Sequence, residues 1–194
     1  MVLRVETGTG MPVRGRVERL LKVRLKAIAK PLVVAALLLL PLVAHPEERQ
    51  NFLDDPFVQL TSGVANCPVP EGPLLTESEV RAEMHARVER GTSCFMAGRC
   101  RLHNAYLYDR EIIGRVGKLV SALAARDPQI AATSLWAEGQ RRWVFLKGCV
   151  QSEAQSQALE ASVRNMDDVE SVINLLMVGA AGTPRYKVAS PAKK

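Results

Sequence analysis

The sequence predicts an α+β fold, in which a helix–strand–strand–helix–strand module with a three-stranded mixed sheet follows a disulfide-stapled, mostly helical or irregular N-terminal extension. Two observations predict it. At 142–178 an apolar run ending near Gly148 precedes a capped amphipathic helix and a second apolar run, which is the spacing of a crossover between parallel strands. An even number of cysteines follows an apolar N-terminal segment, and this predicts two disulfides with three possible pairings among Cys67, Cys94, Cys100 and Cys149.

The N-terminal segment has the pattern of an export signal. Residues 1–44 contain eight Lys/Arg and two acidic residues, a net charge of +6, and the last of these charges is Lys30. The 14 uncharged residues that follow are fewer than the ~20 of a bilayer span and typical of a signal-peptide core. We expect a signal peptide cleaved after Ala44 or an uncleaved N-terminal membrane anchor, a start at Met1 or Met11, and a periplasmic or secreted body.

The remainder of the chain has no net charge. Residues 45–194 contain 18 Lys/Arg and 18 Asp/Glu. Nucleic-acid binding needs a basic surface that neutralises phosphates. The charge balance therefore argues against nucleic acid as a partner.

The extension at 45–107 contains most of the cysteines and little regular periodicity, because five prolines interrupt residues 46–73. We expect a short helix near 56–65. Thr76 and Glu79 then form a capping box, the pattern at which a helix begins, and this helix should end at Gly91.

The module at 108–178 begins with a helix at 109–126, whose apolar residues recur at three- and four-residue spacing and which Asp109 could cap. Strands are expected at 130–137 and 143–150, joined by a turn around Glu138-Gly139-Gln140.

Ser152 and Gln155 form a second capping box, which opens a helix to about residue 165. A third strand at 169–178 should run parallel to the second, because a helical crossover joins the two. The tail at 179–194 is expected to be disordered.

Alternation along the second strand separates its two faces. Val144 and Leu146 should point toward the helices, and Trp143, Phe145 and Cys149 away from them. Uncovered aromatic side chains would form an exposed apolar patch. We therefore expect residues 50–107 to fold across this second face, held down by a disulfide from Cys149.

These strands resemble those of a known family. The second strand has the pattern Val-x-Leu-x-Gly-x-Val, and the third has Val-x-x-Val-x-Asn-x-Leu-x-Val. Together with the preceding helix they resemble a single BON domain across 109–178, with departures at Asp168, where the family usually has Gly, and in a longer hairpin turn. The matching positions are Val144, Leu146, Gly148, Val150, Val169, Val172, Asn174, Leu176 and Val178.

The resemblance implies a noncatalytic envelope domain that binds phospholipid or otherwise supports membrane integrity, and it carries over no ligand residues. We interpret Gly148 as a site of close packing or one where a side chain would clash. We interpret Asn174 as a residue that satisfies backbone groups within the fold.

The hairpin turn is the candidate contact with lipid. Arg141 and Arg142 lie beside Trp136 and Trp143 in the sequence, and an aromatic and cationic tip suits an anionic membrane interface. The alternative is an ordinary exposed turn with both tryptophans packed beneath it.

A metal site is the main chemical alternative. Cys94, Cys100 and His103 form Cys-x5-Cys-x2-His, which together with His85 or Cys67 would supply four zinc ligands. The spacing is looser than that of a zinc knuckle and export favours oxidation, so we favour disulfides and expect no metal and no cofactor.

No Ser-His-Asp order, nucleophile elbow or phosphate loop is present, so we expect no enzyme. Three hypotheses follow: a phospholipid-binding envelope module, a periplasmic protein–protein adaptor that uses the open sheet face or the edge of the third strand, and a Cys/His metal protein.

Overall fold

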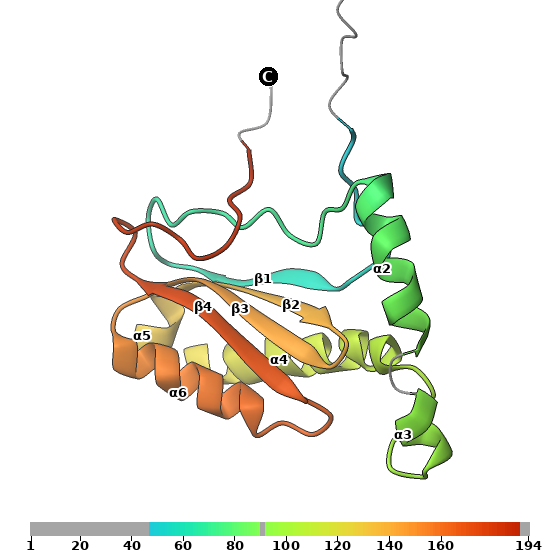
Figure 1. Ribbon diagram of the computed structural model, residues 1–194. Coiled ribbons are helices and arrows are strands. Elements are labelled where there is room, and N and C mark those ends of the chain that lie inside the picture. Colours follow the sequence, from blue (N-terminus) through green and yellow to red (C-terminus); the bar gives the residue numbers. More distant parts are fainter. Residues whose placement is uncertain (1–46, 90–91, 191–194) are drawn as a thin grey trace, which may run out of the picture. The chain divides into compact units, whose positions relative to one another are not determined.

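The computed structural model describes residues 47–89 and 92–190, so the expected leader at 1–44 lies outside the described residues. Four strands form one mixed sheet in the order β1-β2-β3-β4 (Figure 1). β2 is antiparallel to both β1 and β3, and β4 is parallel to β3. Their bounds are β1 Phe57–Ser62, β2 Ser134–Gln140, β3 Trp143–Val150 and β4 Ser171–Val178.

Two long helices lie on one face of the sheet, α4 (Asp109–Ala124) and α6 (Glu153–Arg164). The remaining helices are α2 (Glu77–Glu89), α3 (Thr92–Met96), the short 3-10 helix η1 (Ala105–Tyr108) and α5 (Pro128–Ala131). Within the described part of the chain, no helix is long and apolar enough to cross a membrane.

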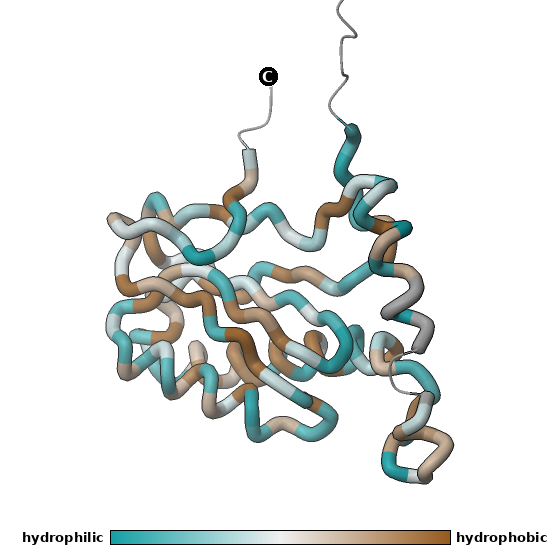
Figure 2. The backbone as a smooth tube through the Cα atoms, viewed as in Figure 1, coloured by the Kyte–Doolittle hydropathy of each residue, from teal (hydrophilic) through white to brown (hydrophobic). Residues whose placement is uncertain are grey.

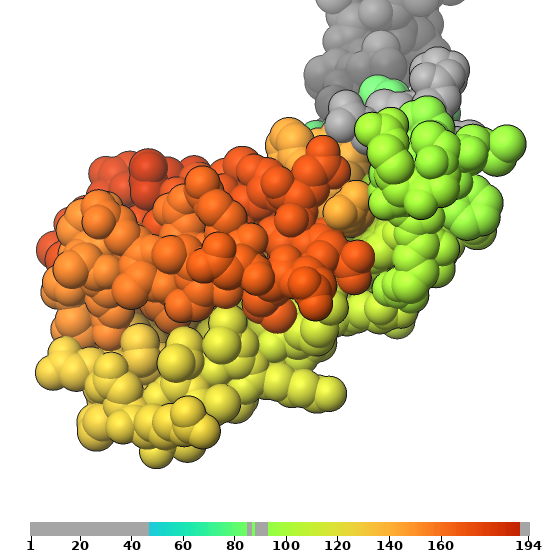
Figure 3. Space-filling model, turned by 90° about the horizontal axis from the view of Figure 1, so that it is seen from below, coloured from blue at the N-terminus to red at the C-terminus, as the bar shows by residue number. Residues whose placement is uncertain are grey.

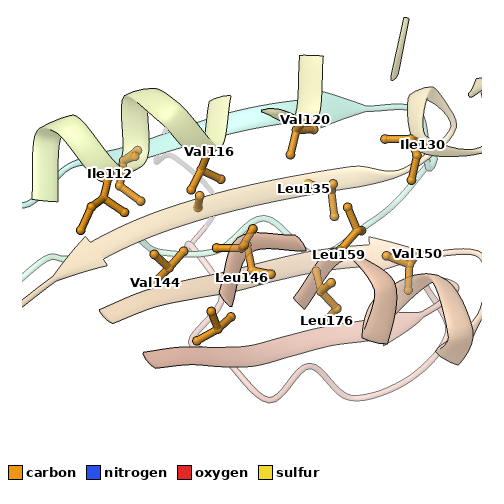
Figure 4. Close-up of a cluster of buried hydrophobic side chains, with 14 of the residues drawn as sticks. Ile112, Val116, Val120, Ile130, Leu135, Val144, Leu146, Val150, Leu159 and Leu176 are labelled. Atoms are coloured by element: carbon orange, nitrogen blue, oxygen red, sulfur yellow. The ribbon is translucent and has the colours of Figure 1, made fainter. Parts of the chain in front are cut away.

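The main core lies between the sheet and these helices, and Figure 4 shows its side chains interleaving. Val144, Leu146 and Val150 of β3 point into it, as the alternation predicted. Burial of apolar surface of this kind is the dominant stabilising contribution to a fold. Among the described residues, hydrophobic ones are concentrated along the central strands (Figure 2).

The expected three-stranded sheet was wrong by one strand. The extension supplies β1, which pairs antiparallel with β2 where a short helix at 56–65 was expected. β1 is an edge strand with a register shift between Gln59 and Thr61, so its pattern of buried residues is irregular. Pairing with a strand about 75 positions away, which periodicity does not report, decided its conformation.

The hairpin also differs from the expectation. The residues at the start of the expected first strand form α5 instead, because Asp127 caps it by accepting from the Gln129 N–H at 2.8 Å and Pro128 occupies its first turn. The turn expected at 138–140 is the two-residue pair Arg141-Arg142, with φ of 61° and 64°. The turn is therefore short, contrary to the longer turn inferred from the family pattern.

Part of the extension lies over the second face of the sheet, and a disulfide from Cys149 holds it there, as expected; its partner is Cys67, which the sequence had left open. Both cysteines and Trp136 form a small apolar cluster, against which Phe57 and Met177 pack.

The C-terminal tail adds to this cover, so the expectation of disorder at 179–194 is wrong for residues 179–190. Tyr186 is buried and its hydroxyl donates to the Pro68 carbonyl at 2.7 Å. The Ala189 N–H donates to the Val69 carbonyl at 2.8 Å. The segments at 63–76 and 179–190 thus run together over the face opposite the helices (Figure 1).

The capping box at Thr76 forms in full, whereas only half of the one at Ser152 forms, because Gln155 Oε1 accepts from the Gln151 N–H. The Thr76 N–H donates to Glu79 Oε2 at 2.8 Å and the Glu79 N–H to Thr76 Oγ1 at 3.3 Å. The Gln155 N–H donates to Ser152 Oγ at 3.2 Å. Asp109 differs, because it is the first residue of α4 and its carboxylate bonds outside the helix.

Candidate functional site

The turn between β2 and β3 is held by a buried carboxylate. Asp109 is 1% exposed, and its two oxygens accept from the backbone N–H groups of Arg141 at 2.8 Å and Arg142 at 2.7 Å. Burial raises the pKa of the Asp109 carboxyl to about 6, although both N–H donors favour the carboxylate. The turn residues adopt left-handed backbone without glycine, and these two bonds offset its cost.

The side chain of Arg142 is fixed on three sides. Its Nε donates to the Asp168 carbonyl at 2.8 Å, and its guanidinium lies 5.1 Å from the centre of the Tyr108 ring. Its Nη1 lies 3.5 Å from Cys100 Sγ. Arg142 therefore links the turn, the α6–β4 loop and the disulfide loop after α3.

Arg141 is held less tightly. Its guanidinium lies 4.9 Å from the centre of the Trp143 ring, a cation–π contact. Its Nε is shielded from solvent and has no hydrogen-bond partner among the described residues.

A cleft of about 250 Å³ opens beside the turn. Arg141, Arg142 and Trp143 form one side, and the second disulfide, Cys94–Cys100, lies across from them. Figure 3 shows the green lobe around α3 standing beside the orange strands and loops at this end. We call residues 93–107 the α3 lobe.

The α3 lobe exposes large apolar side chains. Met96 is 78% exposed and Phe95 42%, and Leu107 in η1 is also exposed. Apolar residues gathered on one projecting element, beside arginines, are typical of surfaces that contact a membrane or a partner. The sequence interpretation missed Phe95 and Met96, although an apolar pair between two closely spaced cysteines was a usable signal.

The structure brings together Arg141, Arg142 and Trp143 but leaves Trp136 out. Trp136 pairs with Lys147 in the middle of the hairpin and is 5% exposed, buried against the Cys67–Cys149 disulfide. Trp136 lies away from the turn because β2 extends to Gln140, farther along the chain than expected.

The two structural candidates lie in the sheet. Gly148 has φ +122°, and a Cβ there would lie 2.0 Å from the Ser134 carbonyl oxygen, so the close approach is to the neighbouring strand. Asn174 Nδ2 donates to Ser156 Oγ and to Glu160 Oε2, both at 2.9 Å, and its Oδ1 accepts from the Leu176 N–H at 3.0 Å. Asn174 thereby joins β4 to α6.

The structure bears on the two alternative sites, the Cys/His metal site and the open sheet face. Cys94 and Cys100 are bonded to each other, so neither sulfur remains as a zinc ligand, and across residues 47–89 and 92–190 no three metal-binding side chains are grouped. The side chain of His85 lies outside the described residues. The sheet face offered to a protein partner is partly covered, and a second cleft of about 370 Å³, lined by Phe145, Lys147 and Leu175 among others, remains over it.

The edge strand β4 is also partly closed. Arg185 Nη2 donates to the carbonyl oxygens of Asn174 and Leu176, at 3.0 and 3.2 Å. Groups already bonded in this way are not free to pair with an added strand.

Comparison with known proteins gives one match. Residues 116–180 match the family model described as BON domain. The match begins within α4 and ends just after β4, and leaves β1, α2 and the α3 lobe outside it. No curated protein and no solved structure matches the chain.

Proposed function

We propose that this chain, which contains a BON domain, is a noncatalytic envelope protein that binds anionic phospholipid surfaces and supports membrane integrity. The contact is the end of the sheet at which the β2–β3 turn and the α3 lobe meet. A BON domain suggests a membrane or phospholipid-binding envelope module. The expected leader would place the body in the periplasm or outside the cell.

The observation that carries the proposal is the pairing of two kinds of side chain at one end of the body. Phe95 and Met96 are exposed on the α3 lobe, and Arg141 and Trp143 lie across the adjoining cleft. Arginine attracts the phosphate of a headgroup, and aromatic rings favour the interface. Full burial of one large apolar side chain contributes roughly 1.5–3 kcal/mol.

The two components predict different behaviour. The attraction between arginine and an anionic headgroup weakens with salt, because the Debye length falls from about 10 Å at 0.1 M to about 3 Å at 1 M. The apolar contribution does not weaken in this way. Binding should therefore be selective for anionic vesicles and decrease with salt.

The test is co-sedimentation of the protein comprising residues 45–194, with both disulfides formed, with phosphatidylglycerol and phosphatidylcholine vesicles at low and high salt. We expect binding to the anionic vesicles alone, reduced at high salt. The double variant Arg141→Glu/Arg142→Glu should lose it. Arg142 also holds the α6–β4 loop, so its replacement could disturb the fold. Arg141→Gln is therefore the milder second variant, and it should weaken binding while the fold remains intact.

Arg126→Gln is the matched control for Arg141→Gln, since it removes the same single charge from an exposed residue just beyond the far end of α4. It should bind like the unaltered protein. Absence of vesicle binding at both salt concentrations would overturn the proposal, as would undiminished binding of the double variant.

A further inference from the structure

We propose that the Cys94–Cys100 disulfide is a thiol–disulfide exchange site, at which a dithiol reductant opens the α3 lobe and Cys100 leaves as a thiolate beside Arg142. This inference does not depend on lipid binding. It rests on the surroundings of the two sulfur atoms.

The bond is accessible. Cys94 and Cys100 are both half-buried, and both line the cleft of about 250 Å³ beside the turn. They are six residues apart, and the chain between them is exposed. Exchange requires that an attacking thiolate reach a sulfur, and the cleft offers that approach.

The other disulfide of the structure differs on each count. Cys149 is fully buried and Cys67 is 9% exposed, and both are packed with Trp136. Its contacts are apolar, which disfavours a thiolate. The same chain therefore contains an internal comparison for accessibility and charge.

Arg142 gives the exchange a direction. Its Nη1 lies 3.5 Å from Cys100 Sγ, and the guanidinium is held independently by the Asp168 carbonyl and the Tyr108 ring. It therefore stays in place when the S–S bond opens. A nearby fixed cation stabilises a thiolate, and a better-stabilised thiolate is the better leaving group.

Two acidic side chains lie near the site, and one of them is engaged in ion pairs. Asp168, which adjoins Arg142, pairs with Arg115 at 3.3 Å and lies 3.8 Å from Arg101. Glu170 also lines the cleft. The charged group in contact with the Cys100 sulfur is nevertheless the guanidinium of Arg142.

The step conserves atoms and electrons. A thiolate of the reductant attacks Cys94 Sγ, forming a mixed disulfide, and the electron pair of the broken S–S bond remains on Cys100. The second thiolate of the reductant then attacks the first sulfur of the reductant, which is bonded to Cys94 in the mixed disulfide. This closes the disulfide of the reductant and releases Cys94 as a thiolate, which takes a proton from water. The reductant is oxidised to a disulfide by two electrons, and the chain gains them.

The test treats the folded, oxidised chain with increasing dithiothreitol, then alkylates it and locates the alkylated cysteines by mass spectrometry. We expect Cys94 and Cys100 to react together at a reductant concentration at least about tenfold below that needed for Cys67 and Cys149. Simultaneous reaction of all four cysteines would overturn the proposal.

Three variants test the role of Arg142. Arg142→Gln should lower the equilibrium constant for reduction of Cys94–Cys100 by roughly three- to tenfold, and Arg142→Lys should restore part of it. Arg115→Gln is the control, because it also contacts Asp168 but makes no contact with sulfur among the described interactions. Equal constants for Arg142→Gln and the unaltered protein would overturn the assignment.

A second measurement is independent of variant folding. In the reduced, unaltered protein, the rate of alkylation of Cys100 against pH should report a thiol pKa below the ~8.5 of a free cysteine. A pKa at or above that value would also overturn the proposal.

Discussion

The two disulfides divide the molecule into a clamped sheet and a projecting lobe. Cys67–Cys149 joins residues 82 apart and closes the covering segment onto the sheet, whereas Cys94–Cys100 joins residues six apart within the α3 lobe. Loop-closure entropy predicts about 4.5 kcal/mol of stabilisation for the first and about 2.4 kcal/mol for the second. The first bond therefore holds distant segments together, and the second sets the shape of one loop.

The surroundings of the bonds differ in the same sense. The clamped region buries Trp136 and packs Met177 against its sulfurs, while the lobe leaves Phe95 and Met96 in solvent. Burial makes the first bond a part of the core. Exposure makes the second a part of the surface at which we propose that a ligand and a reductant act.

The largest expected effect is removal of the clamp. The double variant Cys67→Ser/Cys149→Ala should lower the free energy of unfolding by about 4–5 kcal/mol, because the unfolded chain gains freedom. Cys94→Ser/Cys100→Ser should cost about 2 kcal/mol. Urea unfolding of both variants measures the difference, and equal losses would remove the distinction between the two regions.

Gly148 tests the backbone beneath the clamp. Gly148→Ala should cost about 3 kcal/mol or more, because the residue has φ +122° and its Cβ would meet the Ser134 carbonyl oxygen at 2.0 Å. Gly114→Ala is the matched control, since its Cβ would meet nothing within 4 Å and alanine favours a helix by about 0.5–1 kcal/mol. Urea midpoints that move alike in the two variants would contradict this account.

Asp109 tests the link between α4 and the β2–β3 turn. Its pKa in the folded protein is about 6, above the unfolded value of 3.8, so the folded state binds the proton more tightly between these pH values. Its contribution to stability is therefore greatest below about pH 4 and falls as pH rises toward 6, by roughly 3 kcal/mol in total.

Asp109→Asn should lack this slope. The pKa values of Glu47 and Glu79 are lowered by hydrogen bonds from Ser78 and Thr76, and they add a slope of opposite sign to both proteins. The difference between the two stability profiles from pH 4 to 7 thus isolates Asp109. Parallel profiles would show that the carboxyl of Asp109 does not titrate in this range.

The reduction and vesicle-binding experiments test the other region of the comparison, the α3 lobe. If the α3 lobe is both the reducible and the lipid-contacting region, changes at Arg142 should affect both measurements. Changes at Gly148 or at the Cys67–Cys149 disulfide should act mainly on the free energy of unfolding.

The sequence by itself determined the parts of this protein that depend on near neighbours. The capping boxes at Thr76 and Ser152 located two helix starts, and the alternation along 143–150 assigned the faces of β3. Four cysteines after an export pattern indicated two disulfides. Each of these signals is a hydrogen bond, a periodicity or a composition that spans few residues.

The tertiary structure alone decided the rest. β1 is a strand because β2 pairs with it, and the turn is Arg141-Arg142 because Asp109, 32 positions away, accepts both N–H groups. Residues 179–190 of the tail are held in place because they pack over the sheet face opposite the helices. These features depend on contacts between residues distant in the chain, which local patterns do not encode.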